Sequence, residues 1–146
     1  MPDPASLDYV ASPLGRTRET MEILRRTLGL DPAGYRQDQR FVELTFGNWE
    51  GLTWREVRGR AASLAAARER DKWSFVPPGG ESYAMLFDRL LPAARELQRP
   101  TVLVSHGGVA RALLAALANV PQHEAPRLDI WQGRVLVFED GGYRWV

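Results

Sequence analysis

Two junctions in the sequence place a basic side chain where an apolar run gives way to a helical pattern. Arg16 follows the run LDYVASP, and His106 follows VLVS and precedes Gly107 and Gly108. A guanidinium can grip a phosphate through two hydrogen bonds, and the free N–H groups of a glycine-rich helix start favour an anion. Both junctions could therefore bind a phosphate. Taken alone, however, Arg16 could equally be a solvated surface arginine and His106 a structural histidine.

A third candidate, Glu43, lies in the irregular segment VELTFGNWEG. A carboxyl group in such a segment can protonate a leaving group, or it can form an ordinary ion pair within a loop. Glu50 competes for the same role, but Trp49 and Gly51 on either side of it indicate a turn residue. The second histidine, His123, lies in a polar loop beside prolines and is expected to be exposed.

Apolar residues recur at strand and helix spacings in alternation along the chain. Ser12 is predicted to cap a helix that begins at Pro13, and Gly29 is predicted to end it. An Asp-Gly turn at residues 140–142 predicts a C-terminal hairpin. The predicted strands are residues 7–13, 41–46, 102–105, 130–139 and 143–146, and the predicted helices are residues 14–28, 53–70, 81–97 and 109–117.

This alternation predicts an α/β fold with three layers, in which a mainly parallel sheet has helices on both faces. The length of 146 residues fits one domain, residues 1–146. Ligands of such sheets bind at the carboxyl ends of the strands, where Arg16 and His106 are expected. The site should therefore form where these two junctions meet.

Composition narrows the classes of function. The net charge of +1 gives no overall field for nucleic acid or an anionic membrane, so neither is expected as a partner. No cysteine is present, which excludes a thiolate nucleophile and a cysteine metal site. No apolar run is long enough to span a membrane, and the opening MPDPASLDY lacks the features of a signal peptide. We expect a cytoplasmic protein with no metal ion and no cofactor.

Three blocks of the sequence, in this order, resemble the histidine phosphatase superfamily, the phosphoglycerate mutase-like proteins. They are SPLGRTRET, VELTFGNWEG with PPGGES downstream, and VLVSHGGVAR, and the match extends over nearly the whole chain from Leu7. The resemblance implies phosphoryl transfer through a phosphohistidine, by a phosphomonoester phosphatase or a phosphoglycerate mutase. Arg16, His106 and Gly107 would bind the phosphoryl group of a small phosphorylated substrate, and Glu43 would protonate the leaving group. A homodimer is one expected assembly.

The family's first strand carries an arginine-histidine-glycine motif with the nucleophile and another phosphate-binding arginine, and this sequence contains no such motif. The position that matches His106 binds the phosphoryl group from the side, so His106 is not expected to replace the nucleophile. We therefore expect an N-terminally truncated domain, incomplete before Leu7, whose coding sequence extends upstream of Met1. The missing strand would lie beside the strand that ends at His106.

Three other classes of function compete with this reading. The serious alternative is a non-catalytic phosphate-binding or interaction module that has lost its nucleophile. A serine hydrolase is disfavoured because the SHGG segment follows Ser82, whereas the corresponding loop of those enzymes precedes the serine. A dinucleotide-binding domain is disfavoured because no G-x-G-x-x-G segment follows a predicted strand.

Overall fold

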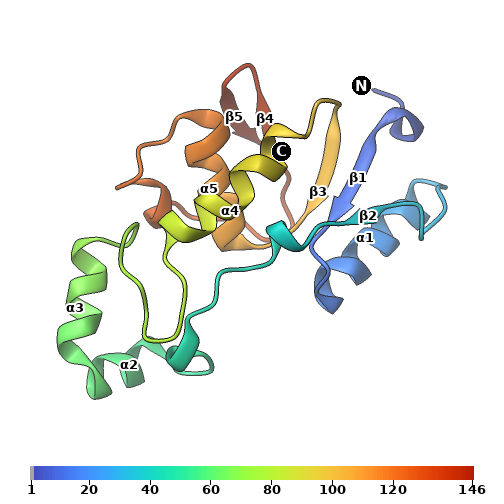
Figure 1. The fold of residues 1–146 in the computed structure, drawn as a ribbon. Coiled ribbons are helices and arrows are strands. Elements are labelled where there is room, and N and C mark those ends of the chain that lie inside the picture. Colours follow the sequence, from blue (N-terminus) through green and yellow to red (C-terminus); the bar gives the residue numbers. More distant parts are fainter. Residues whose placement is uncertain (1) are drawn as a thin grey trace.

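The computed structural model describes residues 2–146, and three parallel strands form its main sheet (Figure 1). The central strand is β1 (Asp8–Ala11). The short β2 (Arg36–Gln37) pairs along one edge of β1, and β3 (Thr101–Val104) pairs along the other over four residue pairs. The carboxyl ends of β1 and β3 therefore lie side by side.

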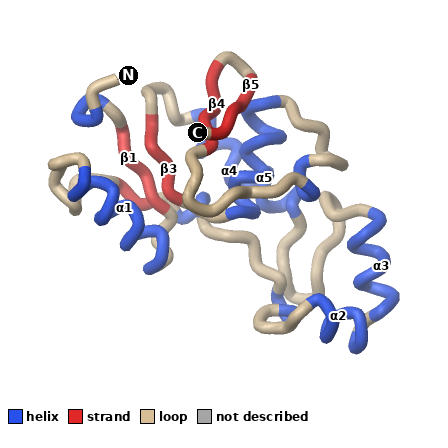
Figure 2. The backbone as a smooth tube through the Cα atoms, turned by 180° about the vertical axis from the view of Figure 1, so that it is seen from behind, coloured by secondary structure: helices blue, strands red, loops and turns tan. Residues whose placement is uncertain are grey.

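Helices cover both faces of this sheet (Figures 1 and 2). Because successive side chains of a strand point to opposite faces, Val10 and Leu103 pack with α4 (Tyr83–Arg95) and α5 (Gly107–Ala118) on one face. The opposite face packs against α1 (Gly15–Thr27) through Tyr9, Ala11, Val102, Val104 and Met21. The predicted three-layer α/β fold is confirmed.

A smaller part of the molecule projects away from the sheet and contains α2 (Trp54–Arg60) and α3 (Ala62–Arg70), drawn in green in Figure 1. The prediction of a single helix over residues 53–70 is wrong, because Ala61 leaves the helical conformation with φ −144° and ψ 55°. The break turns Val57 and Ala65, one from each helix, into the same apolar cluster around Trp49.

Residues 41–46, which the sequence predicts as extended, contain no strand. Phe41 ends a 3-10 turn that begins at Gln39, and the residues after it are irregular. Phe41 and Leu44 are both buried, and a spacing of three does not keep two side chains on one face of a strand. The segment is therefore anchored to the core by its side chains instead of by sheet hydrogen bonds.

The predicted C-terminal hairpin is confirmed, with β4 (Leu136–Glu139) antiparallel to β5 (Gly142–Trp145). The prediction that its first strand begins at residue 130 is wrong, because residues 130–135 are not in a strand. Asp140 and Gly141 both have positive φ, 52° and 73°, which is typical of a type I′ turn. The hairpin is a separate sheet. Among residues 2–146, β3 pairs only with β1, so the edge beside which a further strand is predicted is unpaired.

Candidate functional site

His106 connects the carboxyl end of β3 to α5, and its extended backbone makes it the N-cap residue of that helix. Its ring contacts two residues of the β1–α1 junction. Nε2 lies 2.8 Å from Ser12 Oγ, and Nδ1 lies 3.3 Å from Arg16 Nη2. Because a guanidinium can only donate, Nδ1 accepts this bond and the ring hydrogen is on Nε2. Two segments about 90 positions apart thus meet at one imidazole.

Hydrogen bonds of the backbone fix the junction that carries Arg16. The Ser12 N–H donates to the Val104 carbonyl at 3.0 Å, which extends the pairing of β1 with β3 by one residue. The Thr17 hydroxyl donates to the Ser12 carbonyl at 2.8 Å. Arg16 therefore lies in the first turn of α1, where the helix dipole and the free N–H groups also favour an anion.

Ser12 has a different role from the one predicted for it. The helix begins at Gly15, and its N-cap residue is Leu14, which makes no side-chain capping bond. The prediction of Ser12 as the N-cap and Pro13 as the first helical residue is therefore wrong. The chain turns once more before the helix starts, and this turn leaves the fully buried Ser12 hydroxyl to contact His106.

The Glu43 carboxylate lies at the N-terminus of α5. Its Oε2 accepts a bond from the Gly108 N–H at 3.1 Å, and its Oε1 accepts one from the Leu44 N–H at 3.0 Å. A Cβ at position 108 would overlap with the side chains of Glu43 and Leu44, so this approach requires glycine. The expectation that the Gly108 N–H is open to a phosphate is therefore wrong. Gly107 keeps free space beside it, with Arg111 Nη1 3.6 Å from the position of a Cβ.

The segment that leads into Glu43 is held from two sides. Arg89, in α4, donates at 2.6 Å to the backbone carbonyls of Arg40 and Val42. The Ser105 hydroxyl donates at 2.7 Å to the carbonyl between them. The sequence analysis did not identify Arg89 or Ser105, because these contacts span 47 to 64 positions and no local pattern marks them.

The surroundings of His106 hold its imidazole neutral. Burial lowers the pKa of His106 to about 4, and the positive charges of Arg16 and Arg89 act in the same direction. The site therefore combines a permanent guanidinium charge with a neutral ring. An anion bound between them would offset the arginine charges and raise the pKa of the ring.

We expect His106 in the free protein to titrate near pH 4 and to shift upward when inorganic phosphate binds. Because this folded-state pKa lies below the value of about 6.5 in an unfolded chain, the unfolded state takes up the proton first. The stability that the neutral ring contributes is therefore present above about pH 6.5 and is lost as the pH falls toward 4.

An NMR titration of a His123→Gln variant, in which His106 is the sole histidine, measures this pKa with and without phosphate. Urea unfolding between pH 7 and pH 5 follows the stability. A pKa near 6.5 that phosphate leaves unchanged would contradict the assignment of His106 to the site.

The described residues offer few groups for other kinds of chemistry. Within residues 2–146 we find no group of three or more histidine, cysteine or acidic side chains that could hold a metal ion. No helix in the same range is long and apolar enough to cross a membrane. His123 is 81% exposed at its side chain, and its Nε2 lies 3.6 Å from Glu124 Oε1, as expected for a loop residue.

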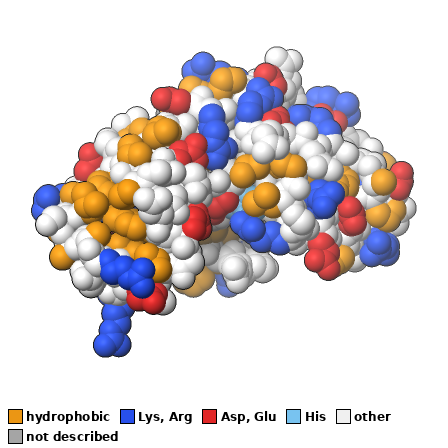
Figure 3. All heavy atoms as spheres, turned by 60° about the horizontal axis from the view of Figure 1, so that its bottom comes forward, with side chains coloured by type: hydrophobic (Ala, Val, Ile, Leu, Met, Phe, Trp, Pro, Cys, Tyr) orange, Lys and Arg blue, Asp and Glu red, His pale blue; other side chains and the backbone are white. Residues whose placement is uncertain are grey.

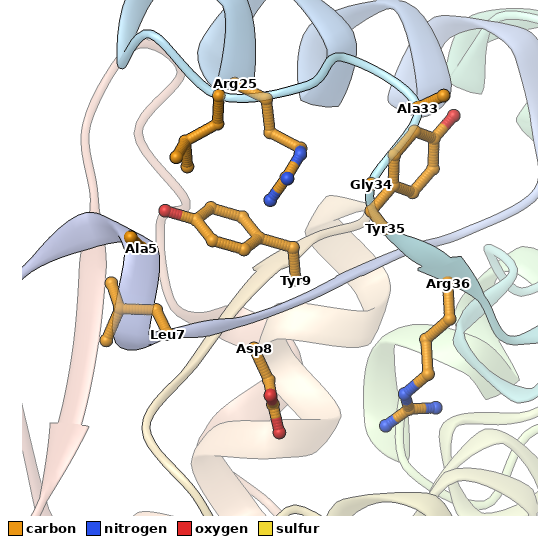
Figure 4. A pocket seen from close by; sticks show the side chains of 10 residues that line it. Ala5, Leu7, Asp8, Tyr9, Arg25, Ala33, Gly34, Tyr35 and Arg36 are labelled. Atoms are coloured by element: carbon orange, nitrogen blue, oxygen red, sulfur yellow. The ribbon is translucent and has the colours of Figure 1, made fainter.

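An open pocket lies at the other end of the strands (Figure 4). Its volume is about 500 Å³, and Asp8 and Tyr9 at the start of β1 contribute to its wall. The Arg25 guanidinium lies 4.4 Å from the centre of the Tyr9 ring and donates to the Asp31 carbonyl. None of the predicted site residues lines this pocket. The chemistry-bearing side chains gather instead at the carboxyl ends of β1 and β3.

The fold is that of the histidine phosphatase superfamily. A family profile of the histidine phosphatase superfamily (branch 1) matches residues 3–146, and the chain belongs to this superfamily. The resemblance carried by the three sequence blocks is thereby confirmed.

Two relatives and one solved structure similar to this chain are named as phosphatases. Fructose-2,6-bisphosphatase of Saccharomyces cerevisiae is 31% identical over 140 residues, which cover 94% of this chain and 29% of the relative. Glucosyl-3-phosphoglycerate phosphatase of Mycolicibacterium vanbaalenii is 40% identical over 103 residues, 62% of this chain and 45% of the relative. A mycobacterial glucosyl-3-phosphoglycerate phosphatase solved with inorganic phosphate superimposes with a TM-score of 0.74 at 30% identity, covering 96% of this chain and 75% of that one. The chain spans less than half the length of the two curated relatives.

Proposed function

We propose that this site binds the phosphoryl group of a small phosphomonoester and takes part in its transfer through a phosphohistidine. The observation that carries the proposal is the meeting of Arg16, His106 and Glu43 at the carboxyl ends of β1 and β3. Each group suits one part of the reaction. The phosphatase names of the relatives support the same class of activity.

In the proposed reaction Arg16 and His106 stabilise charge on the phosphoryl oxygens. The guanidinium supplies a permanent charge and a fork of N–H donors, and the Gly107 N–H at the start of α5 adds a backbone donor. Glu43 gives a proton to the leaving oxygen as its bond to phosphorus breaks, so an alcohol leaves instead of an alkoxide. The hydrogen bonds from Gly108 and Leu44 hold this carboxyl group in place.

The proposed transfer depends on a histidine nucleophile that the printed sequence does not contain at this site. His106 and His123 are the two histidines of the chain. The His106 ring lies between Ser12 and Arg16, where the resemblance assigns it to phosphoryl binding, and His123 is in an exposed loop. We assign His106 to binding of the phosphoryl group and assign the role of nucleophile to neither histidine.

A second candidate function is a non-catalytic phosphate-binding or interaction module. The observation that favours it is the lack of an arginine-histidine-glycine motif in the sequence. A module of this kind would bind phosphate or a phosphomonoester through Arg16 and His106 and would not turn it over. Binding and turnover measured on the same preparation separate the two candidates.

We expect the 146-residue chain to bind inorganic phosphate but to hydrolyse a generic aryl phosphate far more slowly than a mycobacterial glucosyl-3-phosphoglycerate phosphatase assayed beside it. Without an activated nucleophile, only electrostatic positioning remains to accelerate the reaction. Residual turnover that is lost in Glu43→Gln supports the enzyme, and binding with no turnover supports the module. The role given to His106 here is overturned if the unchanged chain hydrolyses the aryl phosphate at a robust rate, if phosphate is trapped on His106 of that chain, and if the activity disappears in His106→Ala. His106 would then be the nucleophile.

A further inference from the structure

Arg25, near the end of α1, is a buried cation without a carboxylate partner. It is 8% exposed, and its guanidinium carbon lies 4.4 Å from the centre of the Tyr9 ring. Its Nε donates to the Asp31 carbonyl at 2.7 Å. None of the ion pairs within 4.0 Å among residues 2–146 includes Arg25. A guanidinium stays charged when it is buried, so this arrangement is costly unless an anion completes it.

The outer nitrogens of Arg25 are open to a pocket. A guanidinium has five N–H donors, and the hydrogen bonds among residues 2–146 use only the one on Nε. No fully buried side-chain nitrogen in this range lacks a hydrogen-bond partner, so Nη1 and Nη2 reach the surface. They do so in the pocket that Arg25 lines at the amino ends of β1 and β2. Figure 4 shows the guanidinium pointing from α1 into the space between Tyr9 and Tyr35.

The other charged side chains of the pocket wall have partners of opposite charge. The Asp8 carboxylate is paired with Arg99 at 3.4 Å, and the Arg36 guanidinium lies 3.6 Å from the Asp38 carboxylate. These pairs leave Arg25 as the source of the excess charge, which is a single positive charge. A ligand that complements the pocket therefore needs one negative charge.

Apolar and aromatic side chains make up much of the remaining wall. They are those of Ala5, Leu7, Tyr9, Leu30, Ala33 and Tyr35. The Tyr35 hydroxyl already donates to the Glu22 carboxylate at 3.0 Å, so its ring is the part that remains for a ligand. The volume of about 500 Å³ lies within the range of about 300–1,000 Å³ that is typical of small-molecule sites, which combine apolar walls with few polar groups. The wall therefore suits a ligand with an apolar body.

We propose that this pocket is a second binding site of the protein, for a small carboxylate with an apolar or aromatic body. A carboxylate accepts two parallel hydrogen bonds from a guanidinium, and it carries the single negative charge that complements Arg25. A phosphate monoester carries more than one negative charge at pH 7 and would leave the excess against an apolar wall, so it fits this pocket less well.

The pocket is separate from the site of Arg16 and His106. The carboxyl ends of β1 and β3 point toward the lower side of the molecule, which Figure 3 turns forward, whereas the pocket wall includes the first residues of β1 at the opposite end. On the side that Figure 3 shows, basic and acidic side chains are mixed with apolar ones. The second site does not rest on the proposed function and can fail while that function stands.

Binding of three matched ligands to the intact chain tests the second site. Calorimetry compares 3-phenylpropionate with 3-phenylpropanol, which has the same body without the charge, and with acetate, which has the charge without the body. We expect 3-phenylpropionate to bind about 10-fold or more tightly than either, because each of the other ligands lacks one of the two contacts. NMR spectra of the same mixture should show shifts of the backbone amides of residues 30–36 and none at His106.

Two variants of the pocket and two controls locate the binding. Arg25→Gln should abolish the preference for 3-phenylpropionate over 3-phenylpropanol, whereas Arg26→Gln, at the exposed neighbouring arginine, should leave it unchanged. Because Arg25 is buried, Ala33→Leu provides a second test that decides if Arg25→Gln fails to fold. Ala33 is an exposed residue of the wall, and a larger side chain there should weaken the binding of 3-phenylpropionate about threefold or more. Ala66→Leu, at an exposed alanine of α3, is its matched control.

The second site is overturned if 3-phenylpropionate shows no saturable binding or if it binds no more tightly than 3-phenylpropanol. An affinity that survives both Arg25→Gln and Ala33→Leu overturns it as well. Amide shifts at Ser12 and His106 in place of residues 30–36 would have the same consequence, because the ligand would then occupy the phosphoryl-binding residues. Arg16→Ala should leave the affinity for 3-phenylpropionate unchanged.

Discussion

Arg16→Ala should weaken the binding of inorganic phosphate by about 10- to 100-fold, because hydrogen bonds between charged groups contribute roughly 1.5–3 kcal/mol. Arg16 is largely free to meet a ligand, since it is exposed and its side chain contacts His106. The Thr20 hydroxyl bonds to its carbonyl and does not depend on its side chain. The substitution should therefore change binding and leave folding nearly intact.

Isothermal calorimetry at pH 7.5 measures this loss, and Arg18→Ala is the matched control. Arg18 is also exposed and lies two residues further along α1, pointing away from the side that carries Arg16. The control should bind phosphate as the unchanged chain does. Equal losses in both variants would mean that the general positive charge of α1 attracts phosphate and that no specific site exists at His106.

Gly47→Ala is expected to be the most destabilising glycine substitution, by about 3 kcal/mol or more. Gly47 has φ +56°, and a Cβ there would overlap with backbone atoms of Pro78, Gly79 and Gly80. Backbone atoms cannot move aside as the end of a flexible side chain can. The two segments cross at this point, where the Asn48 N–H donates to the Pro78 carbonyl at 2.8 Å.

Gly51→Ala separates strain from overlap. Gly51 also has a left-handed φ of +76°, but a Cβ there would have no atom within 4 Å. Its replacement should cost about 1–2 kcal/mol, the usual strain of a left-handed residue. Urea unfolding of the two variants gives the difference. If both lose the same stability, the crossing of the two segments does not constrain the fold.

Local patterns were sufficient to predict the elements that regular periodicity marks. The strand before Ser12, the strand before Ser105 and the Asp140-Gly141 turn all lie where their side-chain patterns place them. The secondary-structure predictions are wrong where tertiary packing, and not a local pattern, determines the backbone conformation. Phe41 and Leu44 are buried without strand pairing, and Ala61 breaks a helix that composition alone would continue.

The site shows the same division between local and long-range information. Arg16, Glu43 and His106 are predicted as site residues because glycines and strand ends mark their positions and because three motifs resemble a family. Arg89 has no such mark, since its role is to bond carbonyl groups nearly fifty positions away. Arg25 is hidden for a related reason: a basic residue near the end of a helix gives no indication that an aromatic ring and a pocket will face it.

The unpaired edge of β3 also bears on how firmly His106 is held. Within the described residues 2–146, β1 is hydrogen-bonded on both edges, whereas β3 is bonded on one, and His106 follows β3 after a single residue. Local opening starts where few hydrogen bonds must break together, so amide protons of β3 should exchange with solvent faster than those of β1. A phosphate that bridges Arg16 and His106 would tie α1 to the end of this strand. The bound anion would then slow amide hydrogen exchange in β3, because the ligand itself would stabilise the strand.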